Sequence, residues 1–140
     1  MASKHAIIII KNAKGEYLQY YEDSWNSYLF LNCKQEDSWD ITKISDTVLE
    51  RLGVKPEKVS FLFEKTHSKY SVKHEKVREY QHFFYLVDID IRNEEAKNEF
   101  VIKDTKFKWF SMESLEKNPE IMQINGDIIG FIKEWFAKQN

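Results

Sequence analysis

The stretch of sequence that decides the fold reads NCKQEDSWDITKISDTVLERLGV and runs from Asn32 to Val54. Its second half repeats apolar residues at the spacing of one helix face, at Ile41, Ile44, Val48 and Leu52. Asp37 or Ser38 can cap the beginning of this helix, Gly53 closes it, and Pro56 prevents it from resuming. We therefore expect a short strand, a polar loop and a helix in this order.

Segments with strand composition lie on both sides of this stretch. Before it, Ala6 to Lys11 and Glu16 to Glu22 are joined by turn residues and should pair as a hairpin, and Tyr28 to Cys33 should form a third strand. After it, strands are expected at Val59 to Thr66, Val77 to Ile91 and Phe107 to Phe110, with a long polar excursion from His67 to Lys76 between the first two.

A short helical turn and one terminal helix are expected near the end of the chain. Ser111 can cap the turn, which continues through Leu115, and Asp127 to Lys138 has the pattern of an amphipathic helix. The resulting order of elements is β-β-β-α-β-β-β-α. This order predicts an α/β fold in which a mixed sheet lies between helices.

Composition limits the classes of protein to be considered. The chain has 140 residues, without repeats or linkers, so we expect a single domain over residues 1–140. The net charge of -2 argues against a dedicated nucleic-acid binder, and no apolar run is long enough for a membrane helix. The lone cysteine permits no intrachain disulfide and fits a cytoplasmic protein, and the four glycines form no phosphate-binding loop.

The layout from Asn32 to Val54 resembles the box of the Nudix superfamily, G-x5-E-x7-R-E-U-x-E-E-x-G-U, where U is aliphatic. Aligned from its C-terminal end, the chain keeps Val48, Glu50, Gly53 and Val54, while Asn32, Ser38, Asp46, Thr47 and Arg51 occupy the other defined positions. The box is therefore degenerate. The strands before it, the run from Phe107 to Leu115 and the closing helix follow the family's order as well. The resemblance implies a Nudix-like α/β/α sandwich with a central mixed β-sheet.

The resemblance also implies a chemistry, which is hydrolysis of nucleoside-diphosphate-linked substrates with Mg²⁺ or Mn²⁺. The family's metal ligands would fall at positions 47, 50 and 51, where only Glu50 is acidic. Asp46 lies four residues before Glu50, so both carboxylates could hold one ion as the metal site. Glu95 or Glu99 would supply a further acid that helps to activate water, and Arg51 would contact a phosphate.

Aromatic residues could bind the base of such a substrate. Trp25, Tyr28 and Trp39 are the main candidates for stacking on it, and Tyr80 is a further one. The alternative to an enzyme is a catalytically inactive Nudix-like module that binds a nucleotide-like ligand or a protein partner. The sequence favours neither nucleic acid nor membrane as a partner, and it leaves open whether the chain forms a homodimer.

Other chemistry-bearing residues give weaker signals. Cys33, at the end of an expected strand, is more typical of a buried apolar side chain than of a nucleophile. The spacing of His67, His74 and His82 matches no zinc signature. The basic and aromatic run from Lys65 to Arg78 could contact phosphates or a protein, although it also fits a solvated hairpin.

Overall fold

The computed structural model describes residues 3–36, 40–71 and 74–139. The chain forms two compact units, the first from Met1–Ile10 with Leu31–Ile91 and the second from Lys11–Phe30 with Arg92–Asn140. Each unit therefore combines two separate pieces of sequence. A single folding domain over residues 1–140 stays a prediction.

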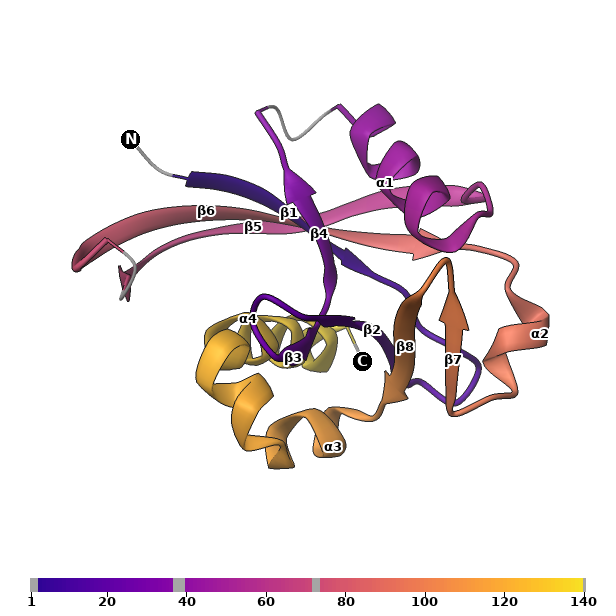
Figure 1. Cartoon of the computed structure of the whole chain (residues 1–140). Helices are drawn as coiled ribbons and strands as arrows, with labels where there is room; N and C mark the ends of the chain where they lie inside the picture. Colours follow the sequence, from indigo (N-terminus) through magenta and orange to yellow (C-terminus); the bar gives the residue numbers. More distant parts are fainter. Residues whose placement is uncertain (1–2, 37–39, 72–73, 140) are drawn as a thin grey trace. The chain divides into compact units, whose positions relative to one another are not determined.

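The first unit contains a four-stranded mixed sheet in the order β4-β1-β6-β5. Its strands are β1 (Ser3–Ile9), β4 (Leu31–Lys34), β5 (Lys58–Ser71) and β6 (Lys76–Asp88). β1 pairs in parallel with β6, whereas the other two pairings are antiparallel. In Figure 1, β5 and β6 run side by side as a long hairpin that extends to the left of the view. The predicted α/β fold with a mixed sheet is confirmed.

Helix α1 (Thr42–Leu52) follows β4 in this unit and buries the apolar face that the sequence predicted, at Ile44, Val48 and Leu52. The predicted end is confirmed, because Gly53 has a left-handed backbone with φ of 73° and its amide donates to the Leu49 carbonyl at 2.8 Å. The helix begins at Thr42, whose amide donates to the Asp40 carboxylate. The caps expected from the sequence, Asp37 and Ser38, lie outside the described residues.

The second unit contains a four-stranded antiparallel sheet in the order β3-β2-β8-β7. Its strands are β2 (Tyr17–Glu22), β3 (Ser27–Leu29), β7 (Glu99–Ile102) and β8 (Thr105–Phe110). Its helices are α2 (Arg92–Glu95), α3 (Met112–Lys117) and α4 (Pro119–Lys138). The sequence did not predict β7 or α2, which are both four residues long.

The helix caps of the second unit follow local sequence. The Ser111 side chain accepts from the Ser114 amide at 3.0 Å, which confirms the predicted beginning of α3. Asn118 caps α4 by accepting from the Ile121 amide at 3.0 Å, so this helix begins earlier than predicted. The backbone of α4 is non-helical at Asn125, just before the segment whose amphipathic pattern the sequence showed.

Two strand predictions are wrong. Residues 6–11 and 16–22 do not form a hairpin, because β1 and β2 belong to different sheets and only an isolated bridge joins Lys11 to Tyr17. Residues 28–33 form two strands, β3 and β4, separated by Phe30. Residues 67–71 and 76 belong to strands β5 and β6, which stay paired as far as Ser71 and Lys76, so the polar excursion expected between the two strands is largely a solvated hairpin. That part of the hairpin is polar on both faces, so it lacks the alternating pattern of a half-buried strand.

Each unit has its own buried apolar side chains. In the first unit they include Ala6, Ile8, Ile9, Phe84 and Tyr85, and in the second unit Leu18, Phe107, Leu115, Ile121 and Ile132. No helix in the described ranges is both long and apolar enough to span a membrane.

Candidate functional site

The outer surface of α1 carries the two carboxylates that the sequence assigned to a metal. Asp46 and Glu50 are both exposed and lie one helical turn apart, so their side chains point from the same side of the helix. Lys43 is also exposed and lies one turn before Asp46. The two carboxylates thus share this surface with one positive charge.

The remaining family positions on α1 carry no acid. The Thr47 hydroxyl donates to the Lys43 carbonyl at 2.8 Å, which is the usual internal bond of a threonine in a helix. Arg51 is half-buried in the last turn, where a cation interacts favourably with the helix dipole. Of the family positions 47, 50 and 51, only position 50 therefore carries a carboxylate, and Asp46 adds a second one to the helix.

Cys33 lies on β4, beside α1. Burial raises the pKa of the Cys33 thiol, while a hydrogen bond with Thr47 and the charge of Lys43 act in the opposite direction. A thiol with a raised pKa is mostly protonated at neutral pH and reacts slowly as a nucleophile. The environment of Cys33 therefore supports its interpretation as a structural residue.

The other predicted site residues belong to the second unit or fall outside the described part. Glu99 is exposed on β7, and Glu95 is the last residue of α2, although its side chain is outside the described structure. Trp25 is 60% exposed in the turn between β2 and β3, and Tyr28 is half-buried on β3. Trp39 lies outside the described residues.

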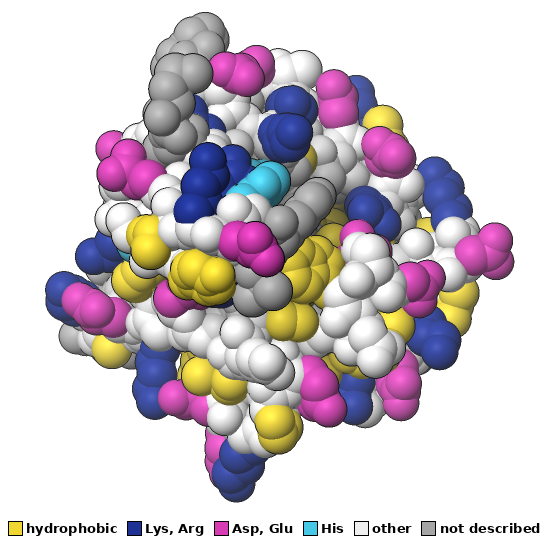
Figure 2. Space-filling model, turned by 60° about the vertical axis from the view of Figure 1, so that its left-hand side comes forward, with side chains coloured by type: hydrophobic (Ala, Val, Ile, Leu, Met, Phe, Trp, Pro, Cys, Tyr) yellow, Lys and Arg dark blue, Asp and Glu magenta, His cyan; other side chains and the backbone are white. Residues whose placement is uncertain are grey.

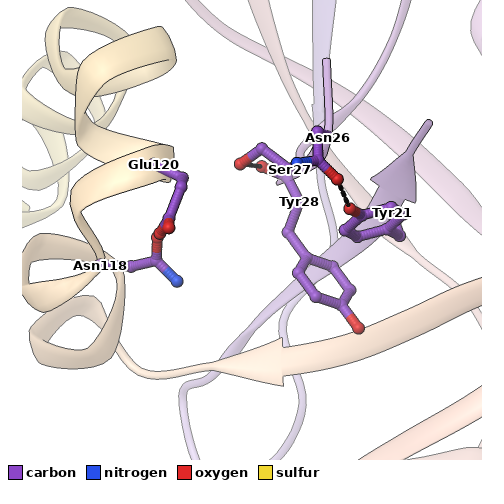
Figure 3. A pocket seen from close by; sticks show the side chains of 6 residues that line it. All are labelled: Tyr21, Asn26, Ser27, Tyr28, Asn118 and Glu120. Atoms are coloured by element: carbon purple, nitrogen blue, oxygen red, sulfur yellow. Dashed lines mark hydrogen bonds between the residues drawn. The ribbon is translucent and has the colours of Figure 1, made fainter. Parts of the chain in front are cut away.

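Tyr28 lines a pocket of about 310 Å³ in the second unit, together with Tyr21, Asn26, Ser27, Asn118 and Glu120. Figure 3 shows Asn118 and Glu120 on the helix side of this pocket, facing Asn26, Ser27 and Tyr28 on the strand side. The Tyr21 hydroxyl donates to the side-chain oxygen of Asn26. The pocket is thus polar on both sides.

The surroundings of Tyr28 raise the pKa of its hydroxyl. Burial raises the pKa of Tyr28, and the nearby charge of Glu99 and the hydroxyl of Tyr21 raise it further. At neutral pH the Tyr28 hydroxyl is therefore protonated and can donate a hydrogen bond. The structure thus brings two predicted site residues, Tyr28 and Glu99, close enough to influence each other.

Sequence reasoning missed most residues of this pocket. Asn26 has a positive φ of 52°, which suits a turn, and Asn118 has the sequence context of a helix cap. Each of these signals predicts local structure and says nothing about a pocket. Only the tertiary fold brings the β2–β3 turn next to the beginning of α4.

The structure also bears on metal binding. Within the described ranges, no three or more His, Cys, Asp or Glu side chains are grouped so that they could hold a metal ion. The donor set on α1 consists of two carboxylates. Two carboxylates fit a Mg²⁺ ion that completes its coordination with water and with phosphate oxygens of a substrate.

Comparisons with known proteins identify the fold. No family model and no curated protein sequence matches the chain. Among solved structures, an Ap4A hydrolase of C. elegans matches with a TM-score of 0.57 and 13% identity over 100% of both chains. A NUDIX hydrolase from Nitrosomonas europaea matches with a TM-score of 0.55 and 16% identity, over 91% of this chain and 88% of that one. A MutT NUDIX hydrolase from Burkholderia pseudomallei has a TM-score of 0.56 and 13% identity, over 89% and 98%. These likenesses confirm the resemblance drawn from the sequence, and the chain has the Nudix fold.

Proposed function

We propose that this protein hydrolyses nucleoside-diphosphate-linked compounds with the help of a divalent metal ion. The observation that supports the proposal is the pair of exposed carboxylates, Asp46 and Glu50, on a helix that ends at a left-handed glycine as the Nudix box does. The similar structures named above are hydrolases, and one of them is an Ap4A hydrolase.

In this proposal, Asp46 and Glu50 would hold Mg²⁺ or Mn²⁺ together with the phosphate oxygens of the substrate. Mg²⁺ is commonly held in this way, by one or two carboxylates and the substrate's own phosphates. When bound, the ion would supply Lewis-acid polarisation of the phosphate oxygens. Arg51, at the end of the same helix, would add a planar donor group that suits a phosphate.

The protein would also need to recognise the nucleoside. Trp25 exposes most of its side chain, and Tyr28 presents a neutral hydroxyl in the pocket of the second unit. An exposed aromatic ring can stack on a base, and a phenol can donate a hydrogen bond to it. We assign base recognition to these two side chains, with Trp39 as the third candidate from the sequence.

A panel of substrates tests the proposal. Purified protein is incubated with Ap4A, ADP-ribose and nucleoside triphosphates in the presence of Mg²⁺ or Mn²⁺, and phosphate-containing products are quantified. Glu50→Gln should lower turnover by about 100-fold or more, because loss of a metal ligand removes several kcal/mol of charge stabilisation. Asp46→Asn should lower it in the same direction.

Glu57→Gln is the matched control, because Glu57 is an exposed carboxylate of the same unit outside α1. It should leave turnover unchanged. Equal activity of wild type and Glu50→Gln, or no turnover of any compound, would contradict the proposal. The same assay on Glu95→Gln and Glu99→Gln tests the predicted role of these acids in activating water.

A second candidate function is binding of a nucleotide-like ligand without hydrolysis. Two residues favour it, because they stand where the family has acids. Thr47 has a hydroxyl that is hydrogen-bonded to the Lys43 carbonyl, and Arg51 has a guanidinium group. A guanidinium can replace the charge of a metal ion next to a phosphate.

Thermal unfolding separates the two functions. A ligand that binds the native state raises the unfolding temperature by mass action. Stabilisation by a nucleotide in EDTA, abolished in Arg51→Ala and retained in Glu50→Gln, would support a metal-independent binding module. Stabilisation that requires Mg²⁺ and is lost in Glu50→Gln would instead support the hydrolase.

A further inference from the structure

One face of the mixed sheet gathers basic and imidazole side chains around the outer half of the β5–β6 hairpin. Residues directly opposite each other on paired strands point to the same face of a sheet. The register pairs Lys34 with His5, His5 with His82, and His82 with Lys65. These four residues form a row across all four strands.

Further rows of the same face lie toward the end of the hairpin. Ser3, Tyr80 and His67 form the second row, Arg78 pairs with Lys69 in the third, and Lys76 pairs with Ser71 in the fourth. Contacts between side chains agree with this assignment. The Arg78 guanidinium donates to the Ser3 hydroxyl at 2.8 Å, and His67 Nε2 lies 2.9 Å from His82 Nδ1.

We call this surface the basic face; its residues are Ser3, His5, Lys34, Lys65, His67, Lys69, Ser71, Lys76, Arg78, Tyr80 and His82. At these described positions there are five permanent cations and three histidines, and no Asp or Glu. The opposite face of the same strands carries Glu64 and Glu79 beside Lys4. A chain with a net charge of -2 thus concentrates positive charge on one side of one sheet.

This arrangement has an energetic cost in the free protein. Lys69 and Arg78 are direct cross-strand partners, and like charges in that position destabilise a sheet. Burial lowers the pKa of His5, and the positive charges of Lys34 and Arg78 lower it further. An anion bound to this face would relieve both effects. Figure 2, with the left-hand side of Figure 1 turned forward, shows a histidine with Lys and Arg side chains beside and above it and an Asp or Glu side chain below.

The aromatic rings of the basic face are arranged for hydrogen bonding at their edges. The rings of His67 and His82 meet at their edges, with centroids 5.0 Å apart and Nε2 of His67 2.9 Å from Nδ1 of His82. The ring of Tyr80 lies nearly parallel to that of His82, with centroids 6.0 Å apart. Their polar atoms lie on the ring edges, where imidazole N–H groups can donate to an oxyanion.

We propose that the basic face is a binding site for the phosphate groups of a small oligophosphate anion, separate from the site on α1. Lys and Arg make strong charge-assisted hydrogen bonds to phosphate oxygens. Neighbouring strands lie about 4.8 Å apart, and alternate residues on a strand about 7 Å apart, so the rows offer a grid for several linked phosphates. The negative net charge of the whole chain disfavours a long polyanion such as RNA as the occupant.

Binding at this face should lead to proton uptake at His5. Burial lowers the pKa of His5, and the charges of Lys34 and Arg78 lower it further. The charged groups that face His5 are Lys34 on β4, Arg78 on β6 and Lys65 on β5. They oppose the charged form of the His5 imidazole, whereas a bound phosphate would favour it.

Calorimetry with inorganic tripolyphosphate tests the proposal on the full chain without added metal. The double variant Lys65→Ala/Lys69→Ala should weaken binding about tenfold, as expected for two partly exposed charged contacts. Lys4→Ala/Lys55→Ala is the matched control, because it removes the same charge from the same unit outside the basic face and should change the affinity by less than about twofold. Equal weakening in both variants would overturn a localised site.

The proton uptake gives an independent readout. Affinity should rise several-fold between pH 7.5 and pH 6, and the heat of binding should depend on the ionisation enthalpy of the buffer. His5→Gln should reduce both effects, while His74→Gln, in the turn outside the face, should not. Affinity that is independent of pH would contradict the role of His5.

The two sites and the possible ligands are distinguished in the same experiment. Glu50→Gln should bind tripolyphosphate as the wild type does, since Glu50 belongs to the proposed hydrolytic site and not to the basic face. Competition of a nucleoside triphosphate with tripolyphosphate would show that the basic face binds the phosphate groups of nucleotides. Tight binding of an RNA oligonucleotide with no binding of tripolyphosphate would overturn the proposal in favour of a nucleic-acid backbone.

Discussion

Individual side chains in this protein gain their properties from neighbours that are distant in sequence. His5 lies half-buried on β1, with its ring centroid 6.1 Å from that of His82. Burial lowers the pKa of His5 below its ordinary value, and the charges of Lys34 and Arg78 lower it further. Neither effect can be read from the residues next to His5 in the chain.

The lowered pKa of His5 predicts a dependence of stability on pH. Between pH 6.5 and the lower pKa of the folded state, the unfolded chain binds the proton more readily, so stability must fall as the pH falls through this range. His5→Gln should lose less unfolding free energy than the wild type between pH 7.5 and pH 5, measured by urea denaturation in phosphate-free buffers. His74→Gln, outside the basic face, should follow the wild type, and an identical pH profile of His5→Gln and wild type would contradict the prediction.

Individual elements show which features are set by local sequence. α1 ends at Gly53 because a left-handed backbone is needed there, and α3 begins at Ser111 because its hydroxyl accepts from an amide of the first turn. These signals act over a few residues, so they were predictable. The outer half of the β5–β6 hairpin was not, because cross-strand pairing stabilises it without a pattern along either strand.

Two glycines of similar exposure should respond to substitution in opposite ways. Gly53→Ala should lower the unfolding free energy by about 1 kcal/mol, because a β-carbon disfavours its positive φ even though the space around it is open. Gly130→Ala, inside α4 and also in open space, should raise it by up to about 1 kcal/mol, because alanine favours a helix. Denaturation midpoints measure both changes, and a stabilising Gly53→Ala would contradict the assigned helix end.

At the scale of the whole molecule, the chain passes between the two units three times. Each unit is assembled from two pieces of sequence, and residues 11–30 of the second unit interrupt the first. The chain leaves each unit and later returns to it, so neither unit can fold from one continuous segment. We therefore expect the two units to unfold together, in agreement with the single domain predicted from length.

Substitutions in the two cores test this expectation. Ile44 on α1 and Ile132 on α4 are fully buried, one in each unit. Ile44→Ala and Ile132→Ala should each lower the unfolding free energy by about 2–5 kcal/mol, because each leaves a cavity. Both should shift one shared transition, seen by calorimetry and by tryptophan fluorescence. Two transitions, each moved by only one of the variants, would contradict a single cooperative domain.

The sequence predicted only part of the candidate site. The helix with Asp46 and Glu50 could be located, because apolar periodicity and Gly53 define it locally. The pocket around Tyr28 could not, because it joins the turn after β2 to the beginning of α4, and no pattern within either segment indicates the other. The basic run from Lys65 to Arg78 was recognised in the sequence as a possible phosphate contact, but only the sheet places His5 and Lys34 beside it.

The sequence by itself determined the class of fold, the end of α1, the beginning of α3 and which residues are apolar enough to be buried, because these depend on backbone preferences and on periodicity over a few residues. Only the tertiary structure decided the strand partners. β1 was expected to pair with the segment that follows it, yet it pairs with β6, joining Ser3 to Tyr80. A strand exposes the same hydrogen-bonding groups to any partner, so the choice depends on the burial of side chains from distant segments, which no local pattern encodes.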